Sequence, residues 1–562
     1  MSPIEKAIKP KLIAVYGELN GEKALTALAQ VIAKFEKVTF PKQTNISQKN
    51  VYLITYGDSI QRTGEAPLVT LDDTLNQVAK NLITDVHLLP MFPYTSDDGF
   101  SVVDYYQIDP DLGDWTMIEQ LGKDYRLMFD FVANHMSKSS EWFQKFLEQD
   151  TEFETAFIKK SSDFDAENVV RPRTSPLFHE YQNSKGELLS AWTTFSEDQV
   201  DVNIRDVAML ARLTDVILTY ALQGASSIRL DAIGFLWKES GTSSMHLTQT
   251  HELIKIWRLL LDYFAPHTQI ITETNVPHEE NISYFGVGED EANMVYQFPL
   301  PPLVLHTFTQ NSSLALSKWA KGIHRVSKSG TYFNFLASHD GIGMRPVEGL
   351  LTDEERQVLV EKVQENGGEI SYKSNPDGSE TVYELNINYS EALRNNGEEE
   401  QIAVQKMIAA HHILLSMVGV PAIYYHSLFG SKNDLDAVNK SGINRRINRE
   451  KLDADQLIAE LQTNAYRNQI FTGISELIQL RKEHASFSPY AEQEVLDFGE
   501  HVFVLKRTAE ETGQVVLSFT NVTNETIELT ELTGLELISN QTIQDKLTLA
   551  PYGVAWLEVT EV

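Results

Sequence analysis

Carboxylates, imidazoles and one guanidinium stand at the ends of four short apolar runs in this chain of 562 residues. In chain order, these residues are His135, Arg229, Asp231, Glu273, His339 and Asp340. Two carboxyl groups that face each other across a sugar ring can cleave a glycosidic bond, one as nucleophile and the other as the acid that protonates the leaving oxygen. Asp231 and Glu273 follow consecutive runs, and we interpret them as such a pair.

The neighbours of this pair suit the same chemistry. Arg229 lies two positions before Asp231, so in a strand it points to the same side and can keep Asp231 ionised as a nucleophile. Glu273 follows an apolar run, where burial raises the pKa of a carboxyl group as a general acid requires. The other three side chains can hydrogen-bond to sugar hydroxyls. A single carboxylate at a strand end is more often a cap or a surface ion pair, but the ordered set favours catalysis.

Eight short apolar runs alternate with amphipathic helical stretches along most of the chain. The alternation predicts an α/β fold, a (β/α)₈ TIM barrel with inserted subdomains, whose catalytic residues lie at the carboxyl ends of the strands. The runs are residues 51–56, 86–91, 127–132, 227–233, 269–273, 294–300, 332–337 and 420–425.

Two intervals are too long for simple barrel connections, and near residue 492 the apolar period changes to two, which is typical of antiparallel strands. The N-terminal extension is either a dimerisation element of a homodimer or a helix packed on the barrel. In chain order we expect an N-terminal helical extension (1–50), a first barrel part (51–142), inserted subdomain B (143–203), a second barrel part (204–344), inserted subdomain B′ (345–398), a last barrel part (399–490) and a C-terminal antiparallel β domain (491–562).

Composition excludes several classes of protein. Acidic residues outnumber Lys and Arg by 79 to 47, for a net charge of −32, which disfavours general binding to nucleic acid or anionic membranes. The absence of cysteine excludes disulfides, zinc–thiolate sites and cysteine nucleophiles. Residues 1–23 lack the apolar core of a signal peptide and no run is long enough to span a membrane, so we expect a cytoplasmic protein.

Four ordered segments resemble the characteristic regions of the α-amylase clan, glycoside hydrolase family 13. They are residues 130–135, residues 229–231, the run that ends in Glu273, and the dipeptide at 339–340. The resemblance implies that Asp231 is the nucleophile, Glu273 the general acid/base and Asp340 the transition-state stabiliser. It also implies that the glucose subsite is lined by His135, Arg229 and His339.

Within this clan the chain is similar to the sucrose-phosphorylase group, in residues 53–56, 98–100, 339–343 and 445–449. This resemblance implies that Asp98 and Arg445 hold glucose hydroxyls and close a pocket for one terminal glucosyl unit, with Phe100 beside Asp98. Asn134 corresponds to a calcium ligand in many amylases, but the sucrose-phosphorylase group generally works without metal, and we expect no metal and no cofactor.

Further stretches are similar to the glucosylglycerate phosphorylases of this group, namely residues 192–196, 235–239, 272–278 and 375–378 and the N-terminal extension. The chain departs from sucrose phosphorylases after Gly343, at Met344-Arg345-Pro346. The implied activity is a retaining phosphorolysis of 2-O-α-D-glucosyl-D-glycerate, with inorganic phosphate as co-substrate. Alternatives are the same mechanism on sucrose 6′-phosphate, glucosylglycerol or sucrose, an α-glucosidase or transglucosylase, and a non-catalytic barrel subunit.

A phosphorylase must bind an anion beside two carboxylates, which requires cationic donors close by. The two insertions offer Arg171, Arg173 and Arg345, and the donors that hold phosphate could also hold an anionic acceptor such as glycerate. For Arg171 and Arg173, a solvated Arg-Pro-Arg loop is an equally good interpretation. The partners we expect are therefore small molecules, an α-glucoside and phosphate, and neither nucleic acid nor membrane.

Overall fold

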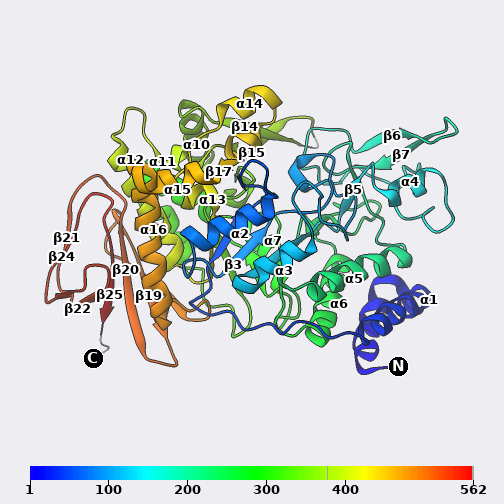
Figure 1. Cartoon of the computed structure of the whole chain (residues 1–562), viewed down its shortest axis with the longest axis horizontal. Coiled ribbons are helices and arrows are strands. Elements are labelled where there is room, and N and C mark those ends of the chain that lie inside the picture. The colour runs from blue at the N-terminus through cyan, green and yellow to red at the C-terminus, as the bar shows by residue number, and fades with distance from the viewer. Residues whose placement is uncertain (376, 560–562) are drawn as a thin grey trace.

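At the centre of the computed structural model, which describes residues 1–375 and 377–559, eight parallel strands close into a barrel (Figure 1). Each of the eight predicted runs supplies one strand, so the prediction of a TIM barrel is confirmed. Around the barrel the strands follow the order β1-β16-β12-β11-β10-β9-β4-β3. Their bounds are β1 (Tyr52–Thr55), β3 (Asp85–Leu88), β4 (Arg126–Phe131), β9 (Ala225–Leu230), β10 (Gln269–Thr272), β11 (Met294–Tyr296), β12 (Thr331–Phe335) and β16 (Val420–Tyr424).

The strands are buried on both faces, which is why they appear in the sequence as continuous apolar runs. The run at 294–300 is longer than its strand, because Pro299 caps a helix and the prolines that follow fit a first helical turn. Helices cover the outside of the barrel, among them α2 (Pro67–Val78), α3 (Trp115–Asp124), α5 (Val207–Leu222), α6 (Thr248–Phe264), α8 (Leu300–Gln310), α12 (Glu400–Ser416) and α16 (Ala465–Glu483).

The first long interval contains a β-hairpin, and its last strand closes back on the chain that leaves barrel strand β4. Strand β5 (His135–Ser137) pairs antiparallel with β8 (Gln199–Asp201), and β6 (Phe178–Gln182) pairs with β7 (Leu188–Trp192). A short helix, α4 (Glu141–Leu147), lies between β5 and β6 in the chain. His135 stands opposite Asp201 in the first pair, so the insertion is joined directly to a predicted site residue.

The second interval forms a three-stranded sheet that reaches back to the barrel. Strand β15 (Glu380–Asn386) lies between β14 (Glu369–Ser374) and β13 (Ile342–Gly343), and β13 follows Asp340 almost directly. The helices of this interval are α10 (Asp353–Glu365) and α11 (Tyr389–Leu393). The resemblance at 375–378 includes Pro376, which lies outside the described residues.

Helix α1 (Pro3–Phe35) forms the N-terminal extension and lies against α5 and α6 (Figure 1). Ser2 and Glu5 form a capping box at its start, and Ile8, Leu12 and Leu28 bury its apolar side. Tyr16 donates a hydrogen bond to the carbonyl oxygen of Ile204 at 2.7 Å. Within this chain the extension is thus packed on two of the helices that surround the barrel.

The C-terminal residues form an antiparallel sheet of six strands and a separate two-stranded ribbon, as the change of period predicts. Residues 560–562 of the predicted β domain lie outside the described residues. The sheet has the order β18 (Glu492–Leu496), β19 (Val502–Ala509), β20 (Gln514–Asn521), β25 (Val554–Val559), β22 (Gly534–Glu536) and β23 (Gln541–Ile543), and the ribbon pairs β21 (Ile527–Leu529) with β24 (Leu547–Leu549).

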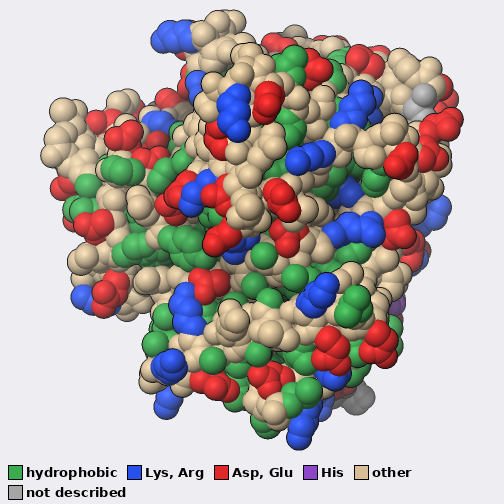
Figure 2. All heavy atoms as spheres, turned by 90° about the vertical axis from the view of Figure 1, so that its right-hand side faces the viewer, with side chains coloured by type: hydrophobic (Ala, Val, Ile, Leu, Met, Phe, Trp, Pro, Cys, Tyr) green, Lys and Arg blue, Asp and Glu red, His purple; other side chains and the backbone are tan. Residues whose placement is uncertain are grey.

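None of the helices in residues 1–375 and 377–559 is both long and apolar enough to cross a membrane. On the face of the molecule shown in Figure 2, acidic and basic side chains are interspersed.

Candidate active site

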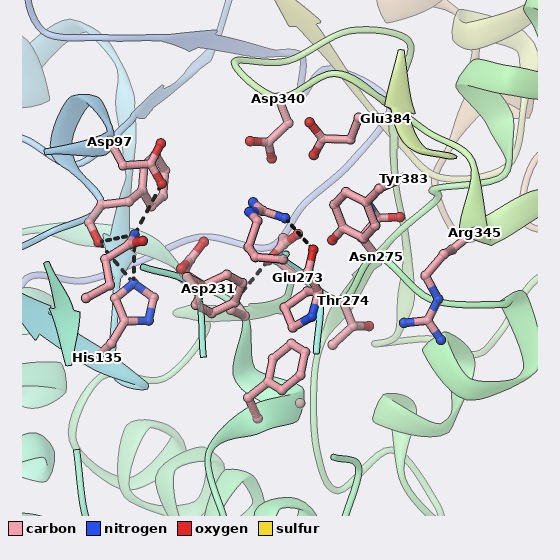
Figure 3. A pocket seen from close by; sticks show the side chains of 18 of the residues that line it. Asp97, His135, Asp231, Glu273, Thr274, Asn275, Asp340, Arg345, Tyr383 and Glu384 are labelled. Atoms are coloured by element: carbon pink, nitrogen blue, oxygen red, sulfur yellow. Dashed lines mark hydrogen bonds between the residues drawn. The ribbon is translucent and has the colours of Figure 1, made fainter. Parts of the chain in front are cut away.

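A pocket opens at the carboxyl ends of the barrel strands. Asp231 and Glu273 lie at its centre in Figure 3, with Asp340 on one side and Arg345 beyond Glu273. The predicted residues that line it are Phe100, His135, Arg173, Asp231, Glu273, His339, Asp340, Arg345 and Arg445. Three predicted residues do not line it: Asp98, Arg171 and Arg229.

Two adjacent strands bring the central carboxyl groups together. Asp231 directly follows β9 and Glu273 directly follows β10, and the Glu273 amide donates to the carbonyl oxygen of Leu230 at 3.1 Å. Ala232 then takes a left-handed conformation, with φ of 47°, which is uncommon for a residue with a side chain. Its N–H donates to Oε2 of Glu273 at 2.9 Å, so this turn links the two carboxyl groups.

Arg229 lies beneath the pocket as a buried cation shared by three carboxyl groups. Its Nη1 donates to Oδ1 of Asp231 at 2.9 Å and also to Asp130, while Nη2 lies 3.8 Å from Oε2 of Glu273. Only 1% of Arg229 is exposed, so these contacts form in a medium that screens charge poorly. The guanidinium therefore stabilises negative charge most strongly on the carboxylates that it touches.

Charge on the two central carboxyl groups is set by burial and by their mutual repulsion. Burial raises the pKa of Asp231, Arg229 lowers it, and Glu273 raises it again, leaving it well above its ordinary value. Burial likewise raises the pKa of Glu273, against the effect of Arg229. Two coupled carboxyl groups in one site favour a state in which they hold one proton between them, because two like charges at close range repel. Because Arg229 bonds directly to Asp231, we assign the negative charge to Asp231 and the proton to Glu273.

Asp340, in contrast to these two groups, has a lowered pKa. Burial alone would raise its pKa, but Arg445 and His339 lower it to well below its ordinary range. The Nη1 atom of Arg445 lies 2.8 Å from Oδ1 of Asp340. The pocket thus combines a carboxyl pair that can hold one proton with a third carboxylate that stays ionised.

Sequence reasoning missed Glu384 and Tyr383, which reach the pocket from strand β15 of the second insertion. Glu384 is 2% exposed and accepts two hydrogen bonds from Arg445, at 3.1 Å from Nε and 2.5 Å from Nη2. Arg445 is therefore fixed between Glu384 and Asp340. The alternation of β15 indicates a strand, but its position beside Asp340 depends on its pairing with β13, for which the sequence carries no signal.

The structure corrects the position of one predicted sugar ligand. Asp98 points away from the pocket and pairs with Arg449 at 2.7 Å and Arg446 at 3.1 Å, whereas Asp97 lines the pocket. The physical reason is the tight turn at 97–99, where φ is 51° at Asp97, 46° at Asp98 and 115° at Gly99. Such a turn sends adjacent side chains in different directions.

Of the three arginines predicted to bind an anion, two line the pocket and one does not. Arg173 and Arg345 line the pocket, and no carboxylate within the described part of the chain forms an ion pair with either. The Arg173 guanidinium lies 5.1 Å from the centre of the Tyr383 ring, and Nε of Arg345 is buried without a hydrogen-bond partner. Arg171 instead donates to the carbonyl oxygen of Ser175 and lies outside the pocket.

Beside Arg345, Thr274 and Asn275 also line the pocket, and sequence reasoning did not single them out. The Oδ1 atom of Asn275 is buried and has no hydrogen-bond partner. Both residues directly follow Glu273, so their place in the chain was the available signal. Over the residues that the structure describes, no group of three or more His, Asp or Glu side chains could hold a metal ion.

Comparison with known proteins places the chain in a family. The family described as "Alpha amylase, catalytic domain" matches residues 66–362. Glucosylglycerate phosphorylase of Escherichia coli (strain K12) is 42% identical over 565 residues, which cover 99% of this chain and 100% of the relative. Glucosylglycerate phosphorylase of Allomeiothermus silvanus is 43% identical, with the same coverage.

One solved structure, also of a phosphorylase, is similar to this chain in fold. The crystal structure of sucrose 6F-phosphate phosphorylase from Thermoanaerobacter thermosaccharolyticum has a TM-score of 0.73 and 26% identity, and the match covers 84% of this chain and 94% of that one. Its identity is well below that of the two full-length relatives. The chain therefore belongs to the α-amylase family, glycoside hydrolase family 13, and within its sucrose-phosphorylase group to the family of the glucosylglycerate phosphorylases.

Proposed function

We propose that this chain uses inorganic phosphate to cleave 2-O-α-D-glucosyl-D-glycerate into α-D-glucose 1-phosphate and D-glycerate, reversibly and with retention. It would thus be a hexosyltransferase of the disaccharide-phosphorylase type. The observation that carries the proposal is the full-length identity of 42–43% to two glucosylglycerate phosphorylases. The geometry of the pocket supports the chemistry, and its two free arginines support an anionic acceptor.

In the first step Asp231 acts as the nucleophile and Glu273 as the acid. A carboxylate oxygen of Asp231 forms a bond to the anomeric carbon while the glycosidic C–O bond breaks. The electron pair of that bond goes to the leaving oxygen, which takes the proton of Glu273, and glycerate departs. The product is a glucosyl ester of Asp231, and Glu273 is left as a carboxylate.

In the second step phosphate takes the place of the leaving group. A phosphate oxygen attacks the anomeric carbon, the ester bond to Asp231 breaks, and Glu273 accepts the phosphate proton. Two inversions give net retention, so the product is the α-anomer. Asp340 stays ionised throughout and stabilises the positive charge that develops on the sugar ring.

The subsites follow from the positions of the remaining side chains. We assign the glucosyl unit to the side of the pocket that holds Asp97 and His135, and the acceptor to the side of Glu273 that holds Arg345 (Figure 3). Asp97 takes the role that the sequence had suggested for Asp98. Arg445 acts on the sugar chiefly by holding Asp340 in place.

Glycerate and phosphate are both anions, so the same cations can receive each of them in turn. Arg173 and Arg345 line the pocket, and within the described chain neither forms an ion pair; Nε of Arg345 is also without a hydrogen-bond partner. A charge-assisted hydrogen bond from a guanidinium to a carboxylate or phosphate is strong and directional. Arg171 lies outside the pocket and is left out of this assignment.

Phosphate release from α-D-glucose 1-phosphate tests the proposal, with D-glycerate, glycerol, fructose and fructose 6-phosphate supplied in parallel. We expect rapid release with D-glycerate and only slow release with the other acceptors and with water. Rapid release with a different acceptor would retain the mechanism and change the substrate. Equal release with every acceptor and with water would favour an α-glucosidase. A cytoplasmic location and a homodimer remain predictions from the sequence.

A further inference from the structure

Lys238 is a buried lysine that the proposed mechanism does not use. It lies seven residues after Asp231, in the connection that leaves β9, and only 3% of its surface is exposed. Its ammonium contacts two groups from other segments: Oδ2 of Asp201 at 2.7 Å and Oδ1 of Asn134 at 2.6 Å. Lys238 thus joins the connection after β9 to strand β8 of the first insertion and to the segment after β4.

These contacts decide which way the Asn134 side-chain amide faces. An ammonium group can only donate hydrogen bonds, so the atom of Asn134 that meets Lys238 must be the oxygen. The amide nitrogen then lies 3.1 Å from Oδ2 of Asp201, and an ionised carboxylate can only accept. Both neighbours demand the same orientation, and flipping the amide would place like groups against each other at both contacts.

The amide in turn decides the tautomer of His135. Its nitrogen lies 3.2 Å from Nδ1 of His135, and because it donates, Nδ1 must be the unprotonated, accepting atom. A neutral imidazole then carries its proton on Nε2, which lies 3.0 Å from the carbonyl oxygen of Phe100, an acceptor. Burial lowers the pKa of His135, which keeps the ring neutral.

We propose that Lys238 is a positioning residue that acts through Asn134 to keep His135 in the tautomer with its proton on Nε2, where the N–H donates to the carbonyl oxygen of Phe100 and fixes the ring at the side of the pocket assigned to the sugar. His135 lines the pocket, whereas Lys238 and Asn134 do not. Without the ammonium, only Asp201 still holds the orientation of the amide. A turn that presents the amide oxygen to Nδ1 is then opposed at one contact instead of two, and in the turned state Nδ1 carries the proton. Nε2 would lose its proton, and with it the ability to donate. The part of this inference that concerns the sugar rests on the proposed function, and the part that concerns the tautomer does not.

Two substitutions separate positioning from simple support. Lys238→Met keeps most of the side-chain volume and removes the ammonium. Asn134→Asp keeps an acceptor for Lys238 but replaces the donor that faces Nδ1 with a second acceptor. As a matched control, Lys138→Met removes an ammonium from an exposed ion pair with Glu197 in the same insertion.

Nitrogen NMR of the ¹⁵N-histidine-labelled chain reads the tautomer directly, with the His135 signals identified as those missing from His135→Gln. In the unsubstituted chain and in Lys138→Met we expect an unprotonated Nδ1 and a protonated Nε2. In Lys238→Met and Asn134→Asp we expect Nδ1 to gain the proton in part or in full. In the same two variants kcat/KM for α-D-glucose 1-phosphate should fall by about tenfold to a hundredfold, as when an outer group that orients a histidine is removed.

An unchanged His135 tautomer in folded Lys238→Met would overturn the proposal, even if activity fell, because Lys238 would then act only as a support. If Lys238→Met does not fold, Asn134→Asp decides the question by the same spectrum, since it retains the ammonium and its ion pair with Asp201. If the unsubstituted chain transfers glucose to none of the acceptors, the proposed function fails, while the spectra still test the tautomer.

Discussion

At the scale of single residues, the partners of each carboxyl group decide its charge. Asp231, Glu273 and Asp340 lie in one pocket, yet Asp340 alone forms an ion pair with Arg445, and its pKa is low while those of the other two are raised. The proposed mechanism needs this inequality, because Asp340 must stay ionised to stabilise the developing positive charge while the other two carboxyl groups hold a proton between them. The difference in pKa therefore depends on the neighbouring cations as much as on the acids themselves.

Glu273→Gln should change the pH dependence as well as the rate. Glu273 acts in the first step as a protonated acid, so activity should fall as pH rises through its raised pKa, and glutamine cannot titrate. We expect cleavage of the glucosylglycerate to fall by about 10² to 10⁴-fold and the alkaline limb of the kcat/KM profile to disappear. α-D-Glucosyl fluoride needs no proton on its leaving group and should lose much less, and an equal loss with both substrates would contradict the acid role.

Arg345→Ala and Arg173→Ala should weaken the binding of both anions. Loss of one charge-assisted hydrogen bond costs about 1.5–3 kcal/mol, so we expect KM for phosphate and for D-glycerate to rise by about tenfold to a hundredfold. Hydrolysis of α-D-glucosyl fluoride by water involves no anionic acceptor and should be nearly unchanged. Arg171→Ala is the matched control, because this arginine lies outside the pocket. Unaltered affinity for phosphate in either variant would remove that arginine from the proposed subsite.

At the scale of secondary-structure elements, the second insertion is part of the active site. Strand β15 pairs with β13, so the segment that carries Asp340 is the edge of a sheet built by the insertion. The same strand supplies Glu384, which holds the arginine that holds Asp340. The barrel therefore presents Asp340, while the insertion sets its position and its charge.

Gly341→Ala tests how closely these elements must approach. A Cβ at position 341 would lie 2.9 Å from the carbonyl oxygen of Leu385 and 2.9 Å from Cβ of Glu384, so the loop would have to move away from β15. We expect kcat/KM to fall by about 10²-fold, since a displacement of about 1 Å at a catalytic group has that effect. Gly322→Ala is the control, because its Cβ would meet only the carbonyl oxygen of Trp319, at 3.4 Å. Full activity in Gly341→Ala would show that this approach does not position Asp340.

At the scale of the whole molecule, buried polar residues join the barrel to the C-terminal sheet. His412 of α12 donates or accepts a hydrogen bond at 2.9 Å with Thr520 of β20, and its ring stacks on Trp556 at 4.9 Å. Arg507 of β19 donates to the carbonyl oxygen of Ser416 at the end of the same helix, at 2.7 Å. These contacts link the folding of the sheet to that of the barrel.

His412→Gln should make the chain less sensitive to acid. Burial lowers the pKa of His412 to about 3, whereas in the unfolded chain it is about 6.5. Between these values the unfolded state binds a proton that the folded state does not, so the free energy of unfolding falls by about 1.4 kcal/mol per pH unit as pH decreases. Denaturant unfolding at pH 6, 5 and 4 measures this slope, which should be smaller by about that amount in the variant. An unchanged slope in His412→Gln would contradict the assignment.

The sequence by itself determined the barrel and the residues most suited to the chemistry. Eight apolar runs of strand length predicted the eight barrel strands, because burial on both faces leaves a continuous apolar pattern that is local in the chain. Asp231, Glu273 and Asp340 could be singled out because each stands at or near the carboxyl end of such a run. That they share one pocket follows from the parallel strands, whose carboxyl ends meet at one face of a barrel.

Only the tertiary structure decided which neighbours control these residues. The choice between Asp97 and Asp98 depends on three successive positive φ angles, which the residue types alone do not specify. Glu384 reaches Asp340 through pairing between strands, and Lys238 reaches Asn134 from a separate connection of the barrel. Contacts of this kind join segments that are far apart in the chain. These contacts arise from packing and from the need to pair every buried charge, so no local pattern in the sequence predicts them.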